Sequence, residues 1–131
     1  MSVFRFKKFN VVNERSAMKV NTDGVILGAA MSILPSDRSM LDIGTGTGTI
    51  ALMAAQRLHD CARQSAESFD SQFKDENDFR IDAIDIDEPS ATEAAANFEA
   101  SLWSETLKAY NLSLQDFAQK ESGKYDLIFS N

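Results

Sequence analysis

Residues 41–52 read Leu-Asp-Ile-Gly-Thr-Gly-Thr-Gly-Thr-Ile-Ala-Leu, and this stretch decides the fold. A short apolar run ends in an acid, three alternate glycines follow, and an apolar helical pattern begins. The pattern predicts a strand, a tight turn and the start of a helix. Because glycine has no side chain, such a turn lets a ligand approach the backbone and the helix N-terminus closely.

Two classes of ligand use a turn of this kind. Dinucleotides favour the pattern Gly-x-Gly-x-x-Gly/Ala, but here the third dinucleotide position is Thr49. The acid before the turn, Asp42, would repel a pyrophosphate and would suit a ligand that carries an ammonium or a sulfonium. S-adenosylmethionine carries both, so we favour this cofactor. A nicotinamide oxidoreductase, or a tight turn without any ligand, is the alternative.

The composition is that of one modest globular domain of 131 residues. No apolar run approaches the roughly 20 residues of a membrane helix, and no apolar block follows the basic N-terminal residues as in a signal peptide. The single cysteine, Cys61, excludes an internal disulfide, and the single histidine, His59, excludes a multi-histidine metal site. We expect a cytoplasmic protein without a bound metal.

The charge of the chain is unevenly distributed. The net charge is −7, but residues 1–20 hold five basic side chains and one acidic one, so this segment carries +4 and the remainder −11. A basic arm on an acidic body either contacts phosphates or is simply solvated. We therefore divide the chain into a basic N-terminal arm, residues 1–21, and an α/β domain, residues 22–131.

The rest of the chain alternates strand and helix patterns. In the first half, the expected elements are a strand or hairpin within 3–12, an irregular stretch at 16–21, a helix from an N-cap at Thr22-Asp23 to Leu34, a strand at 39–43 and a helix from 48 to 58 or slightly beyond. A polar segment at 61–79 is expected to end this helix and form a mobile loop. In the second half, we expect a strand at 80–86, a helix at 88–101, a strand within 107–114 that is best placed at 109–114, a short helix near 119, a turn at 122–123 and a strand at 125–130. This order predicts an α/β fold with a parallel sheet and right-handed crossovers.

Polar groups follow the ends of the predicted strands. They are Asp42 with the glycine turn after the first sheet strand, Asp85 after the second, Asp116 and Phe117 after the third, and Asn131 after the fourth. Ligands of parallel α/β sheets bind beyond the carboxyl ends of the strands. Although a lone acid is more often a helix or turn cap, four such groups at successive strand ends favour one common site.

Each of these groups has a plausible task in binding a nucleoside. Asp85 is suited to accept hydrogen bonds from both ribose hydroxyls, with Asp87 and Glu88 as rival candidates. Asp116 is suited to accept from an adenine amine, and Phe117 to stack on the base. The sequence therefore predicts a pocket for a positively charged adenosine derivative.

On these residues the sequence resembles the class I S-adenosylmethionine-dependent methyltransferases. Residues 41–48 match their first motif, 83–87 their second, 113–117 their adenine-contacting segment, and 126–131 the strand that leads into the Asn-Pro-Pro-Tyr/Phe motif of amine methyltransferases. The resemblance implies a Rossmann-like sheet with its parallel strands in the order 3-2-1-4. It also implies that the cofactor is contacted by Asp42, Gly44, Thr45, Gly46, Gly48, Asp85, Ile86, Asp116 and Phe117.

A narrower resemblance concerns the N-terminal residues. Phe-Lys-Lys-Phe at 6–9 and Ser-Ala-Met-Lys-Val-Asn-Thr-Asp-Gly-Val-Ile-Leu-Gly-Ala at 16–29 are similar to the bacterial tRNA adenine N6-methyltransferases that modify a valine tRNA. This resemblance implies that Thr22 and Asp23 border the cofactor pocket and that the basic arm binds tRNA. It further implies that Asn131 is the catalytic asparagine, which with a proline carbonyl accepts hydrogen bonds from the adenine amine.

The family pattern continues beyond Asn131 with two prolines and an aromatic residue. We expect the chain to be the cofactor-binding part of a longer enzyme, with methyl transfer only in the longer form. The alternatives are a cofactor-binding fragment without activity of its own and a methyltransferase for another amine, such as protein glutamine. Leu127, Ile128 and Phe129 would then lie on an unpaired strand edge, so we also expect a homodimer through this edge or aggregation.

Overall fold

The computed structural model describes residues 2–66, 78–120 and 123–131. Its centre is a four-stranded parallel sheet with the strand order β5-β4-β3-β6. Counted along the chain from the first strand of this sheet, the order is 3-2-1-4, which confirms the predicted topology. The strands are β3 (Ser39–Ile43), β4 (Arg80–Ile84), β5 (Leu107–Tyr110) and β6 (Leu127–Ser130).

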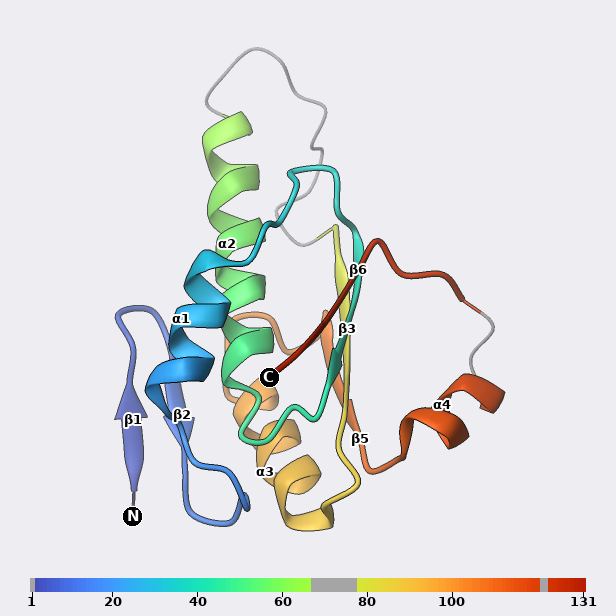
Figure 1. Ribbon diagram of the computed structural model, residues 1–131. Coiled ribbons are helices and arrows are strands. Elements are labelled where there is room, and N and C mark those ends of the chain that lie inside the picture. The colour runs from blue at the N-terminus through green and yellow to red at the C-terminus, as the bar shows by residue number, and fades with distance from the viewer. Residues whose placement is uncertain (1, 67–77, 121–122) are drawn as a thin grey trace.

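The helices cover the two faces of the sheet unequally (Figure 1). Three helices lie on one side of the sheet, and a fourth, short helix lies on the other. The first three are α1 (Thr22–Ala30), α2 (Thr49–Ala66) and α3 (Glu88–Glu99), and the fourth is α4 (Leu114–Lys120). No helix within the described ranges is long and apolar enough to cross a membrane.

The N-terminal residues form an antiparallel hairpin of β1 (Val3–Arg5) and β2 (Asn10–Val12), as the sequence predicts. The hairpin packs beside α3 on the outside of the helical layer (Figure 1). Phe9 and Val11 are buried in the main core. The basic arm is therefore anchored to the domain by its apolar residues, while the side chains of Arg5, Lys7 and Lys8 are exposed.

Two apolar clusters fill the space on either side of the sheet. The larger cluster joins the hairpin, α2, α3 and the strands, and its centre includes the fully buried Trp103, Phe98 and Met40. The smaller cluster, beneath α4, consists of Leu41, Ile84 and Phe117 with partly buried neighbours. Burial of apolar area, at about 25 cal/mol per Å², thus stabilises one face far more than the other.

The structure corrects two predicted helix boundaries. The N-cap of α1 is Asn21, whose Oδ1 accepts a hydrogen bond from Gly24 N at 2.9 Å, and not Thr22-Asp23. The helix ends at Ala30, four residues before the predicted end. The C-cap residue Met31 has an extended backbone with ψ of 146°, and the Arg57 guanidinium donates to its carbonyl at 2.7 Å.

Other boundaries also shift. The third sheet strand is Leu107–Tyr110, which lies within the predicted range 107–114. The narrower placement at 109–114 is wrong, because Ser113 Oγ accepts from Asp116 N at 3.1 Å and so starts α4. Helix α2 reaches Ala66, so residues 61–66 are helical as part of the predicted helix end. The predicted mobile loop lies largely outside the described residues, as does Ser122 of the predicted turn.

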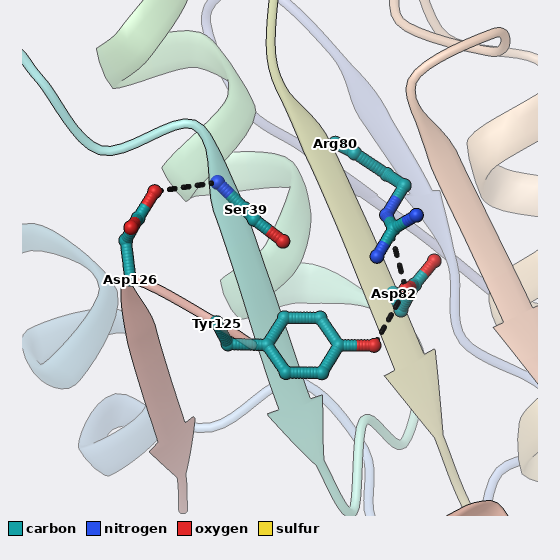
Figure 2. Close-up of polar contacts among 5 residues, drawn as sticks. All are labelled: Ser39, Arg80, Asp82, Tyr125 and Asp126. Carbon is teal, nitrogen blue, oxygen red and sulfur yellow. Dashed lines mark hydrogen bonds and ion pairs between the residues drawn. The ribbon is translucent and has the colours of Figure 1, made fainter. Parts of the chain in front are cut away.

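Five residues form a polar cluster at the amino ends of the strands, here called the amino-end cluster (Figure 2). Asp82 is almost fully buried, and its Oδ2 accepts from the Tyr125 hydroxyl at 2.7 Å and pairs with Arg80 Nε at 3.2 Å. The carboxylate of Asp126 accepts from Ser39 N at 3.1 Å. These contacts fix the start of β6 against β3 and β4.

Candidate cofactor site at the glycine turn

The glycine turn, residues 44–48, connects β3 to α2 at the carboxyl end of the sheet. All three of its glycines have positive φ angles of 73°, 57° and 85°. The N–H groups of Gly44 and Thr45 both donate to the Ile84 carbonyl, at 2.9 and 3.0 Å. A Cβ at Gly48 would lie only 2.6 Å from Phe98 Cε1. Hydrogen bonds to β4 and close packing against α3 therefore hold the turn in one conformation.

A cavity with a volume of about 30 Å³ opens beside this turn. A Cβ added at Gly44 would meet no atom within 4 Å, so the space above this glycine is clear. A ligand can therefore approach the backbone of the turn. The lining residues are Met18, Lys19, Val20, Asn21, Gly24, Gly44, Thr45, Gly46, Thr47, Thr49, Ile50 and Asn131.

One wall of the cavity is the segment 13–21, here called the strap, which crosses over the glycine turn. A Cβ at Gly46 would lie 3.4 Å from Met18 O and 3.5 Å from Ser16 Oγ. The buried carboxylate of Glu93 accepts hydrogen bonds from the backbone N–H groups of Arg15 at 2.7 Å and Ser16 at 3.1 Å. Helix α3 thus holds the strap in place.

The same helix links the hairpin to the turn through Asn97. Its Oδ1 accepts from Val12 N at 2.8 Å, and its Nδ2 donates to Val12 O at 3.0 Å and to Thr47 O at 2.8 Å. Because a side-chain amide presents donors and an acceptor together, a single residue joins β2 to the glycine turn. The hairpin, the strap and the turn therefore form one framework.

Asp42 lies beneath the turn and does not line the cavity. Its side chain is buried, with Oδ2 accepting from the Thr45 hydroxyl at 2.8 Å. Its Oδ1 has no hydrogen-bond partner among the described residues. Burial raises the pKa of Asp42 to about 7, the Thr45 hydrogen bond opposes this, and the charge of Asp85 adds to it. Any effect of this acid on a ligand acts through the turn.

Asp85 also binds the turn itself. Its Oδ2 accepts from Gly46 N at 2.9 Å and its Oδ1 from Asp87 N at 2.9 Å. The carboxylate is half-buried beside the glycine turn but is not among the residues that line the cavity. The next residue, Ile86, is 78% exposed. Contacts of both residues with a ribose remain predictions.

The other candidate residues are distributed around the site. Asn131 lines the cavity at the end of β6, with its Nδ2 3.2 Å from where a Cβ of Gly24 would lie. Thr22 and Asp23 are exposed and lie between two lining residues. Asp116 is exposed in α4, and Phe117 is buried in the smaller core. The structure thus brings Gly44, Thr45, Gly46 and Asn131 together, and contacts of the others with an adenine or a cofactor stay predictions.

Sequence reasoning missed most of the strap. A signal for it exists in α3, where Ser90, Glu93 and Asn97 repeat at the spacing of one helix face. All three side chains are buried in an otherwise alanine-rich helix. Buried polar side chains need hydrogen-bond partners, so this face indicates that an irregular segment packs against it.

Curated relatives match nearly the whole chain. The tRNA1(Val) (adenine(37)-N6)-methyltransferase of Flavobacterium johnsoniae is 43% identical over 129 residues, which are 98% of this chain and 47% of that protein. Proteins of the same name from Trichodesmium erythraeum and Serratia proteamaculans are 44% and 42% identical over 128 residues, 46% and 42% of their lengths. These matches confirm the predicted resemblance. The chain spans about half the length of the curated relatives it matches.

A solved structure supports the same fold. The chain is similar to an O-methyltransferase from Bacillus cereus, determined in complex with SAH, with a TM-score of 0.55 and 18% identity over 89% of this chain and 47% of that chain. This likeness confirms the predicted Rossmann-like α/β fold. No family model matches the chain.

Proposed function

We propose that this chain is the cofactor-binding part of an S-adenosylmethionine-dependent methyltransferase that modifies the N6 amine of an adenine in tRNA. The observation that carries the proposal is the open glycine-turn cavity in a chain 43% identical to a tRNA1(Val) (adenine(37)-N6)-methyltransferase. A nicotinamide oxidoreductase is disfavoured because the relatives are methyltransferases and Thr49 occupies the third dinucleotide position.

The residues at the turn fit the proposed cofactor. The clear space above Gly44 admits a ligand that approaches the backbone closely. The carboxylate of Asp85 lies against the same turn, which suits the predicted hydrogen bonds to ribose hydroxyls. When bound, the cofactor supplies an activated methyl group, and the turn and the strap hold its amino-acid portion between them.

Asn131 is proposed to position the base that receives the methyl group. The exocyclic amine of adenine is a poor nucleophile because its lone pair is delocalised into the ring. An amide oxygen that accepts a hydrogen bond from this amine orients the nitrogen toward the cavity, and positioning of this kind contributes several kcal/mol to catalysis. Asn131 lies at the end of β6 and lines the same cavity as the glycine turn, which supports this role.

The basic arm is proposed to contact the phosphates of tRNA. Arg5 and Lys7 are exposed on the hairpin, whereas Lys8 Nζ pairs with Asp60 Oδ1 at 2.8 Å. We expect Arg5 and Lys7 to contribute more than Lys8, because Lys8 would have to give up its partner. Replacing Arg5 or Lys7 should weaken tRNA binding and make the affinity for tRNA less dependent on salt. Filter binding at several salt concentrations measures both effects. An unchanged salt dependence for both variants would contradict this role.

A second copy of the chain is a proposed partner at β6. This strand pairs with β3, and its own residue Ile128 is 55% exposed. Exposed strand edges with apolar side chains recruit other strands. Light scattering over a dilution series tests this proposal, since a monomer at every concentration would contradict it.

Calorimetry and a methyl-transfer assay test the main proposal. The chain should bind S-adenosylmethionine and S-adenosylhomocysteine, and should not bind NAD. Unmodified tRNA is then incubated with labelled cofactor and either this chain or a protein of the relatives' full length, and N6-methyladenosine is identified by mass spectrometry. We expect product with the longer protein. Absence of cofactor binding would overturn the proposal, and binding with methylation of a protein glutamine would change only the substrate.

A further inference from the structure

The cavity wall carries a charge opposite to the one predicted for it. Of the residues that line the cavity within the described ranges, Lys19 is the one with an ionisable side chain. The two acids beside the turn do not line the cavity, since Asp42 is buried beneath the turn and Asp85 accepts from Gly46 N. The wall therefore favours an anionic group in the ligand.

The start of α2 adds to this positive potential. The helix has 18 residues and no acidic side chain in its first turn, and its first residue, Thr49, lines the cavity. The hydroxyls of Thr47 and Thr49 bond to each other at 2.7 Å, so they bring no charge to the helix end. Because backbone N–H groups at a helix N-terminus carry partial positive charge, Lys19 and α2 act on the cavity in the same sense.

The peptide unit between Lys19 and Val20 is held by two side-chain amides. Asn13 Oδ1 accepts from Val20 N at 3.0 Å, and Asn21 Nδ2 donates to Lys19 O at 3.0 Å. The strap is in turn bound to α3 through Glu93. A charge on a fixed backbone contributes more to binding than one on a mobile loop, because less conformational entropy is lost.

We propose that Lys19 is the counter-ion for the carboxylate of the amino-acid portion of the cofactor. This inference rests on the proposed function and extends it to a binding residue. It places the amino-acid end of the ligand between the strap and the start of α2, and leaves the adenosine toward Asp85. It also explains how a cavity without an acidic wall accepts S-adenosylmethionine, since the carboxylate is the anionic group of that molecule.

The test compares two ligands that differ in this carboxylate. S-adenosylhomocysteine carries the amino-acid end, and 5′-methylthioadenosine lacks it. Calorimetry with Lys19→Met should show about a fivefold loss of affinity for S-adenosylhomocysteine, the upper range of an exposed ion pair, and no change for 5′-methylthioadenosine. Lys19→Arg should retain most of the affinity. Lys108→Met removes the same charge from the exposed side of β5 and should change neither ligand.

Salt gives a second readout. The difference between the native chain and Lys19→Met should shrink at about 0.5 M salt, where charges are screened within a few ångströms. Equal losses for both ligands would show that Lys19 only supports the strap, and no loss would show that it does not contact the carboxylate. Either result overturns this inference while leaving the proposed function intact. If the native chain bound neither ligand, the proposed function itself would fail.

Discussion

The two ends of one parallel sheet use acidic residues differently. In the amino-end cluster, the buried Asp82 in the middle of β4 accepts from Tyr125 and pairs with Arg80 (Figure 2). At the carboxyl end, Asp42 is buried on the neighbouring strand with one oxygen bound to Thr45 and the other without a partner among the described residues. A buried acid alone therefore does not distinguish the proposed binding end. What distinguishes it is a buried acid with one unpartnered oxygen beneath a backbone turn that a ligand can reach.

The difference has an energetic side. A buried polar atom without a partner costs about 1–3 kcal/mol, and the carboxyl end of the sheet retains this cost at Asp42. The amino-end cluster avoids it by joining residues from adjacent strands. We infer that the amino-end cluster stabilises the sheet, whereas the carboxyl end combines an open turn with a destabilising buried acid, Asp42.

The largest expected effect on stability comes from a substitution where the glycine turn packs against α3. Gly48→Ala should lower the free energy of unfolding by about 3–5 kcal/mol, because the new Cβ combines a positive φ with overpacking. The φ angle is 85°, and the Cβ would lie 2.6 Å from Phe98 Cε1. Urea denaturation followed by circular dichroism measures the loss.

Gly44→Ala is the matched control for this substitution. Its φ of 73° is similar, but a Cβ there would meet nothing within 4 Å. We expect a stability loss of about 1–2 kcal/mol from the backbone conformation alone, together with weaker binding of S-adenosylhomocysteine. Equal destabilisation by the two substitutions would show that contact with α3 does not hold the turn.

The sheet and its turn could be predicted from sequence because both depend on local patterns. The run at 41–48 combines a buried strand, three glycines and a helix start, and β3 begins and ends at the predicted residues. The strap could not be predicted, since its position depends on hydrogen bonds to Glu93, which is 77 residues away from Ser16. For the same reason, the positions of the strand ends did not predict that Phe117 packs in the smaller core or that the carboxylate of Asp42 is buried beneath the turn.

The second prediction concerns the pH dependence of the carboxyl end. The pKa of Asp42 is raised from 3.8 to about 7 in the folded chain. The folded state therefore binds a proton more tightly than the unfolded state, so this contribution to stability is complete below pH 3.8 and is lost as the pH rises through about 7. Between about pH 5 and pH 8, Asp42 should lower the free energy of unfolding by about 2.5 kcal/mol.

Asp42→Asn should remove this pH dependence, because an amide does not titrate in this range. Urea denaturation of both proteins at several pH values measures the difference. The variant should gain stability relative to the native chain as the pH rises. Parallel pH curves for the two proteins would contradict the idea that the carboxyl end contains a buried acid that is not fully compensated.

The smallest expected effect lies at the amino end. Tyr125→Phe removes the hydroxyl that donates to Asp82 at 2.7 Å, and we expect a loss of about 1–1.5 kcal/mol of stability. Affinity for S-adenosylhomocysteine should not change, since the cluster lies at the strand ends opposite the glycine turn. A double-mutant cycle with Asp82→Asn should give a coupling of about 1 kcal/mol. A loss of cofactor affinity in Tyr125→Phe would show that the two ends are energetically coupled. The division into a stabilising end and a binding end would then be wrong.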